Sequence, residues 1–123
     1  MGNHNEIEVR RMFEFEAAHQ LPNYDGACAH VHGHSYKLEV ALKAPINPVT
    51  GMVMDFKELN RIVTEEIVSK LDHKWLNDIF PMPTAEIMVQ GMWDTLITVL
   101  PGLYEVVLYE TANSCAKITR GED

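Results

Sequence analysis

Hydrophobic and polar positions alternate along four stretches of the chain, which is the pattern of β-strands. The first stretch covers residues 7–15, and the second keeps every second residue from His32 to Leu42 on one face, ending at the turn-rich segment 44–51. Residues 103–111 alternate again, and residues 114–120 follow after a turn near Asn113. The last two stretches are therefore predicted to pair as a hairpin.

Between the second and third stretches, apolar residues recur at steps of three and four, which predicts two helices. The first is expected over residues 56–71, with Asp55 as its N-cap. The second is expected to begin at Thr84 and to stop before Pro101-Gly102. Its predicted inward-facing residues are Val89, Trp93, Leu96, Ile97 and Leu100.

The order of two strands, two helices and two strands predicts an α+β fold. Short connections favour a four-stranded antiparallel sheet with both helices on one face. The uncovered face would need a partner, so an oligomer is expected. The chain has 123 residues without a repeat or linker, and we expect one domain over residues 1–123. The methionines predicted to lie in the core are Met12, Met52, Met54, Met88 and Met92.

Composition and charge narrow the class of protein. Apolar residues make up 46% and charged residues 23%, a soluble globular balance. A formal net charge of −8 argues against nonspecific binding of nucleic acid. No apolar run reaches the roughly 20 residues that span a bilayer, and the first ten residues do not look like a signal peptide. We expect a cytoplasmic protein, in which Cys28 and Cys115 stay unpaired.

Half of the histidines of the chain lie in the segment CAHVHGH, residues 28–34. Residues two apart in a strand point to the same side, roughly 6.6 Å apart, so His32 and His34 can converge on one metal ion. His30 would lie too far along the strand from His34 to join them. His19, at the end of the first strand, is the predicted third ligand. Three neutral ligands with an open position are typical of catalytic zinc.

Other candidate residues each have more than one interpretation. Cys28 is either a small buried hydrophobe, a fourth zinc ligand or a thiolate with a lowered pKa. Asp72-His73 fits a helix C-terminus, or a carboxylate that orients a proton-transfer imidazole. Glu110 shares a strand face with apolar residues, so it either reaches water at the sheet edge or binds a ligand.

Two further residues, Thr84 and Glu86, are explained as a helix N-cap and a first-turn acid. Cys115 has no predicted role beyond packing.

Six sequence blocks then occur in one order along nearly the whole chain: FEAAHQLP, CAHVHGHSY, TGMVMDF, LDHKWLND, PTAE and VLYET. In this the chain resembles the 6-pyruvoyltetrahydropterin synthase family. The resemblance implies a tunnelling fold, in which subunits join their sheets into a barrel, usually as a homohexamer built as a dimer of trimers. It also implies active sites at the subunit interfaces.

The resemblance further implies roles for single residues. Zinc would be held by His19, His32 and His34. The residues that match catalytic positions of the family are Cys28, Asp72 and His73. Glu110 matches the carboxylate that anchors the pterin ring, and Thr84 and Glu86 fall at further positions of the pterin pocket.

Within the family, the chain looks most like the branch that forms 6-carboxy-5,6,7,8-tetrahydropterin for queuosine biosynthesis. Three residues separate Cys28 from His32, as in that branch, whereas the pyruvoyl-forming branch carries a longer insert. The implied substrate is 7,8-dihydroneopterin triphosphate, with acetaldehyde and triphosphate released. A pyruvoyl or hydroxymethyl product on the same fold is the alternative. The basic residues that could contact the triphosphate are Lys37, Lys117 and Arg120.

A noncatalytic alternative is a zinc-stabilised module in which Cys28 completes a closed four-ligand site. It would leave Glu110 and the Asp72-His73 pair without a purpose.

Overall fold

The computed structural model describes residues 5–21 and 30–121, and it is built on a mixed five-stranded sheet in the order β3-β1-β2-β4-β5. The strands are β1 (Ile7–His19), β2 (His32–Ala44), β3 (Lys74–Trp75), β4 (Leu103–Thr111) and β5 (Ser114–Thr119). Neighbouring strands are antiparallel except β3, which runs parallel to β1. The four strands predicted from alternation are therefore present.

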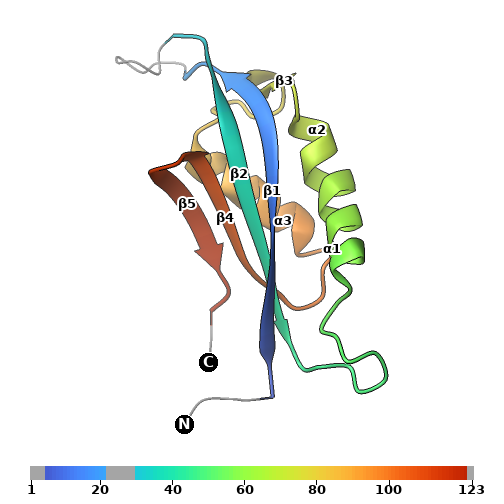
Figure 1. The fold of residues 1–123 in the computed structure, drawn as a ribbon. Coiled ribbons are helices and arrows are strands. Elements are labelled where there is room, and N and C mark those ends of the chain that lie inside the picture. The colour runs from blue at the N-terminus through green and yellow to red at the C-terminus, as the bar shows by residue number, and fades with distance from the viewer. Residues whose placement is uncertain (1–4, 22–29, 122–123) are drawn as a thin grey trace.

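Both main helical segments lie on one side of the sheet (Figure 1). The first consists of α1 (Phe56–Val63), a π-helical turn η2 (Thr64–Val68) and α2 (Ser69–Leu71); the second is α3 (Ala85–Leu96), preceded by the short 3-10 turn η3 (Leu76–Asp78). Asp55 caps α1 as predicted, since its carboxylate accepts a hydrogen bond from the Lys57 N–H at 2.8 Å. The two segments pack against opposite halves of the sheet, α1 and α2 against β1 and α3 against β4 and β5.

Three details of the predicted fold are wrong. The sheet has a fifth strand, β3, and is not purely antiparallel. A strand of two residues is too short to show alternation in the sequence, so β3 could not be predicted from it. β3 forms because it pairs with the free edge of β1. The first helix is interrupted by the π-helical turn, and Phe56 at its start is exposed. Its later apolar positions Leu59, Val63, Ile67 and Leu71 are buried as predicted. The second ends at Leu96, which leaves Ile97 46% exposed rather than buried.

The core lies between the helices and one face of the sheet. Every second residue of β1 and β2 points into it, and Tyr36, Leu38 and Val40 are fully buried. Met88 and Met92 are core residues as predicted, but Met12 is 53% and Met52 41% exposed. Met12 follows the alternation of β1 onto the opposite face of the sheet, where no helix covers it.

The uncovered face of the sheet carries a network of charges. Arg10 contacts Glu8 and Glu39, both at 2.9 Å, and Glu105 at 2.6 Å. Burial alone would raise the pKa of Glu105, but the hydrogen bonds from the Thr119 hydroxyl and the Arg10 guanidinium outweigh it, so that this pKa lies below its usual range. The assembly of such sheets into an oligomeric barrel stays a prediction.

Within the described residues, no helix is both long enough and apolar enough to cross a membrane.

Candidate metal centre

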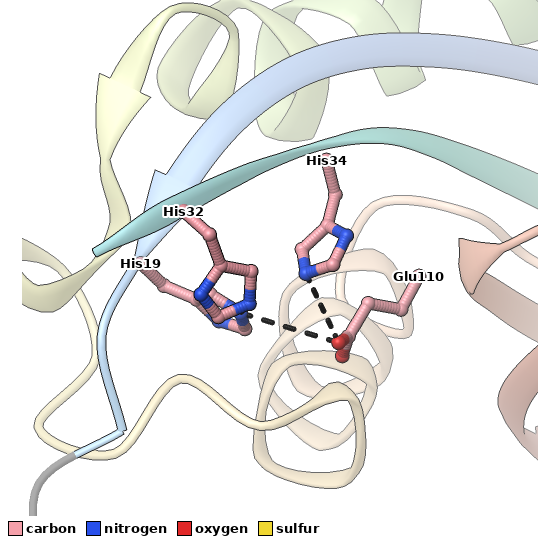
Figure 2. A group of neighbouring side chains, drawn as sticks. All are labelled: His19, His32, His34 and Glu110. Carbon is pink, nitrogen blue, oxygen red and sulfur yellow. Dashed lines mark hydrogen bonds and ion pairs between the residues drawn. The ribbon is translucent and has the colours of Figure 1, made fainter. Parts of the chain in front are cut away.

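The three predicted histidines meet at one end of the sheet, together with Glu110 (Figure 2). His19 is the last residue of β1, and it pairs directly with His32, the first residue of β2. His34 lies two residues further along β2, on the same face. Among the described residues, one ligand atom from each of these four side chains lies within 4.8 Å of the others. The sequence had placed Glu110 in the substrate pocket, not among the histidines.

Hydrogen bonds from the backbone fix how two of the rings present their nitrogens. His19 Nδ1 lies 2.8 Å from the Pro83 carbonyl oxygen, and His32 Nδ1 lies 2.7 Å from the His30 carbonyl oxygen. A carbonyl can only accept, so each Nδ1 must carry the proton. In the neutral rings, each Nε2 then presents a lone pair, the arrangement that a metal ligand requires.

The lone pairs face one another. His19 Nε2 and His32 Nε2 are 3.0 Å apart, and neither has a proton to share when both rings are neutral. His34 Nε2 is buried without a hydrogen-bond partner, although Glu110 Oε1 is only 3.2 Å away. Ligands at about 2.0–2.2 Å from a tetrahedral zinc would stand about 3.3–3.6 Å from one another. The residues therefore fit a bound cation of this kind.

The histidine rings pack closely against one another. His19 is completely buried, and its ring packs edge-on against those of His32 and His34. Desolvation is the main cause that lowers the pKa of His34, and the neighbouring histidines lower it further against the opposing effect of Glu110. A neutral imidazole is the form that binds metal.

His30 contributes its backbone rather than its ring. Its side chain is exposed, while its carbonyl orients His32. Cys28, the predicted catalytic residue of the same segment, lies outside the described residues.

Asp72 and His73 form a pair at the edge of the sheet, beside β1. His73 Nδ1 lies 3.1 Å from Asp72 Oδ2, and the imidazole is 79% exposed. Asp72 Oδ1 accepts the Glu16 N–H at 2.9 Å, which is the main cause that holds the pKa of Asp72 below its usual range. Asp72 therefore stays ionised beside the ring at neutral pH.

The backbone of His73 is unusual. Its φ of 60° lies in the left-handed region, and its N–H donates to the Glu16 carbonyl. Such a conformation costs about 1–2 kcal/mol for a residue with a Cβ. His73 directly follows Asp72, the C-cap of α2, a position where helices commonly end in the left-handed conformation. The proton-transfer role of His73 stays a prediction.

Thr84 and Glu86 lie at the start of α3. The Thr84 hydroxyl accepts the Ile87 N–H at 3.2 Å, so Thr84 is the N-cap, and Glu86 is the exposed acid of the first turn. The same helix start presents the Pro83 carbonyl to His19, which connects it to the histidines. A role of either side chain in a pterin pocket stays a prediction.

An open cleft of about 530 Å³ joins the two groups of candidate residues. Its lining includes His34, His73 and Lys74. Lys74 was missed from the sequence, although it directly follows the Asp72-His73 pair. The basic residues predicted to contact a triphosphate lie elsewhere: Lys117 pairs with Glu105, Arg120 stacks on Tyr104, and Lys37 lines a separate cavity.

Asn77 was also missed, and it holds the strand end that carries His19. Its side-chain amide donates to the Gln20 carbonyl at 2.7 Å and accepts the Gln20 N–H at 3.0 Å. Together with the contact from Asp72 to Glu16, it fastens β1 on both sides of His19. The sequence offered no signal for this contact, because LDHKWLND has no periodicity that distinguishes Asn77.

Replacing Asn77 by alanine should lower the free energy of unfolding by about 1–3 kcal/mol, because two backbone groups of Gln20 lose their partners. Metal affinity should fall as well, since His19 becomes less well held. Chemical denaturation and metal titration measure the two effects. Asn113→Ala is the matched control, because the hydrogen bond of Asn113 uses its backbone N–H. Equal unfolding free energies and metal affinities of the two variants would contradict the role of Asn77 in holding the end of β1.

The chain is similar to known proteins in both sequence and fold. A 6-carboxy-5,6,7,8-tetrahydropterin synthase from Synechocystis is 36% identical over 116 aligned residues, which cover 89% of this chain and 90% of that protein. A 6-pyruvoyl tetrahydrobiopterin synthase from Pongo abelii is 35% identical over 140, covering 98% and 96%. The solved structure of the Caenorhabditis elegans 6-pyruvoyl tetrahydropterin synthase matches with a TM-score of 0.85 at 24% identity, over 98% of this chain and 100% of that one.

The structural likeness confirms the predicted tunnelling fold. Residues 8–121 match the profile described as 6-pyruvoyl tetrahydropterin synthase, and the blocks that carry the histidines, Asp72-His73 and Glu110 all fall inside this range. The chain belongs to the 6-pyruvoyl tetrahydropterin synthase family.

Proposed function

We propose that the chain is a zinc-dependent lyase that converts 7,8-dihydroneopterin triphosphate and water to 6-carboxy-5,6,7,8-tetrahydropterin, acetaldehyde and triphosphate. The observation that carries the proposal is the convergence of His19, His32 and His34, with two of the rings oriented by backbone carbonyls. The activity named for the Synechocystis relative supports the reaction. The carboxy-forming branch of the family suggests a cytoplasmic role in the synthesis of 7-deazapurines such as queuosine.

The three histidines would hold the metal, which when bound acts as a Lewis acid toward the oxygen atoms of the substrate side chain. Glu110 lies beside the histidines of the same site (Figure 2), and its carboxylate is proposed to accept two N–H bonds from the amino-pyrimidine edge of a pterin. Such anchoring would be the positioning part of catalysis.

Proton transfer is assigned to Cys28 and His73. Asp72 orients the His73 ring at 3.1 Å, and because the ring is largely exposed it can reach a substrate that lies in the cleft beside it or in a neighbouring subunit. We propose Cys28, as thiolate, for removal of a proton from the carbon side chain. Thr84 and Glu86 are proposed as pterin-pocket residues at the start of α3.

The choice of product rests on the short segment between Cys28 and His32. The alignment to the Pongo abelii relative extends over 140 positions although this chain has 123 residues, so that relative contains stretches that are missing here. The alignment to the Synechocystis relative extends over only 116. The pyruvoyl product is nevertheless the second candidate, because the identity to the two relatives is almost equal.

Product identification tests the proposal. The zinc-loaded protein is mixed with 7,8-dihydroneopterin triphosphate, and mass spectrometry identifies the pterin while a coupled alcohol dehydrogenase assay detects acetaldehyde. Carboxytetrahydropterin with acetaldehyde is the expected result. A pyruvoyl product would reject the assignment to the carboxy-forming branch, but the conversion of the pterin triphosphate would stand. The absence of any product from a protein that holds zinc tightly would favour the noncatalytic zinc module.

A further inference from the structure

A row of three residues crosses the sheet near the histidines. The short strand β3 lies beside the end of β1 (Figure 1), and its Lys74 pairs with Ala17 of β1. Ala17 in turn pairs with His34 of β2. Neighbouring strands are about 4.8 Å apart, so the backbones of Lys74 and His34 are separated by roughly 10 Å. A basic side chain therefore begins two strands away from a predicted metal ligand.

The cleft of about 530 Å³ is lined by all three residues of this row. Its volume is that of a small-molecule site, for which about 300–1,000 Å³ is typical. The chain has ten lysines and arginines, and all of them lie within the described residues. Among them, Lys74 alone lines this cleft. An anionic ligand in the cleft therefore has one lysine within its reach and no arginine.

The positive charge of Lys74 is not neutralised by the described part of the chain. Lys74 is exposed, and no carboxylate of the described residues forms an ion pair with it. Glu16, which lines the same cleft, accepts a hydrogen bond from the Ser35 hydroxyl at 2.7 Å. Asp72 accepts the Glu16 N–H at 2.9 Å and lies 3.1 Å from His73 Nδ1. Both carboxylates thus have other partners, and the ammonium group of Lys74 is available to a ligand.

The proposed substrate requires a cation of this kind. Its triphosphate carries several negative charges into a protein with a net charge of −8, so a local positive group has to attract it. Lysine binds phosphate as a point charge with three N–H donors. The triphosphate is bonded to the carbon side chain that the histidine site is proposed to bind. Its phosphoryl groups extend from there over a distance that a flexible lysine side chain can reach.

We propose that Lys74 binds the triphosphate group and thereby makes the site select the triphosphate over the dephosphorylated pterin. This inference rests on the proposed function, since it names a substrate-binding residue of the same site. Lys74 then serves the same substrate as the adjacent His73. The pair joins recognition of the phosphates to the proposed proton transfer on one short segment.

Binding of inorganic tripolyphosphate tests the inference without turnover. Calorimetry compares the zinc-loaded wild type with Lys74→Gln, Lys74→Arg and the control Lys37→Gln, whose lysine lines a separate cavity. We expect Lys74→Gln to bind tripolyphosphate about 10–100-fold more weakly, the loss of one charge-assisted hydrogen bond. Lys74→Arg keeps the charge and should keep most of the affinity, and Lys37→Gln should match the wild type. Zinc content is measured after each titration, because tripolyphosphate also binds metal ions.

A second measurement uses 7,8-dihydroneopterin, which has the ring and the side-chain hydroxyls of the substrate but no phosphate. Its affinity should be the same in the wild type and in Lys74→Gln, because the lysine contacts only the phosphates. With the triphosphate substrate, Lys74→Gln should raise KM about 10–100-fold, by the same lost interaction.

The outcomes separate this inference from the proposed function. Equal affinities of the wild type and Lys74→Gln for tripolyphosphate would overturn it, even where the wild type forms the carboxy product. An equal loss in Lys37→Gln would also overturn it, since net charge alone would then explain the effect. A matching loss of 7,8-dihydroneopterin binding in Lys74→Gln would reject the selection of the triphosphate. Failure of the proposed function appears instead in the product assay, as a wild type that binds tripolyphosphate through Lys74 and forms no pterin product.

Discussion

Replacing His19 by alanine should remove zinc from the protein, from about one ion per chain to nearly none after dialysis. His19 is completely buried at the centre of the group, 3.0 Å from His32 Nε2 and 4.0 Å from Glu110 Oε1. Its removal leaves two histidines and a carboxylate around an enlarged space. Changes in outer-shell partners already cost about 10–100-fold in metal affinity, and a direct ligand should cost more. Metal analysis of the dialysed protein measures the loss.

The control for this experiment is His30→Ala. The His30 ring is exposed, and its carbonyl, which orients His32, remains in the variant. His30→Ala should therefore keep its zinc. His32→Ala repeats the test at a less buried position, where the loss of packing is smaller. An unchanged zinc content in His19→Ala would reject the proposed ligand set.

The part of this site that could be predicted from sequence is the part set by local geometry. His32 and His34 share a strand face because alternate residues of a strand must do so. His19 joins them because β1 and β2 pair in antiparallel register, with His19 opposite His32. Apolar alternation on both strands excludes a shift of the register by one residue, since such a shift would turn the buried side chains outward.

Glu110 could not be placed in this way. It lies on β4, which reaches β2 only after the chain has passed through both helical segments. The register of that pairing depends on how the helices pack, and it includes an irregularity between Ala41 and Leu42. The sequence predicted an inward carboxylate in need of a partner, but not that the partner would be the histidines.

Tertiary contacts also explain the missed strand. β3 is two residues long and lacks any pattern, and side chains hold it in place: Asp72 binds the Glu16 N–H and Asn77 binds Gln20. These contacts fasten the segment that carries His73 to the strand that carries His19. The segment LDHKWLND, which the sequence indicates as the end of a helix, therefore also lines the cleft beside the histidines.

Replacing Cys28 by alanine should leave the fold and the zinc unchanged and lower turnover by about 10²–10⁴-fold, the contribution typical of a general acid or base. The reason is the proposed role of its thiolate in removing a proton from the substrate side chain. Steady-state turnover, zinc content and circular dichroism are measured on the same preparation. Cys115→Ala is the matched control, since Cys115 is exposed on β5 and should lose nothing.

The same variant also decides between a closed and an open metal site. In the noncatalytic module, Cys28 completes the shell, so Cys28→Ala would lose zinc and stability together. In the proposed enzyme, His19, His32 and His34 hold the metal and leave one position open, so Cys28→Ala keeps the metal. Full activity of Cys28→Ala would instead remove the thiol from the mechanism and leave proton transfer to the Asp72-His73 pair.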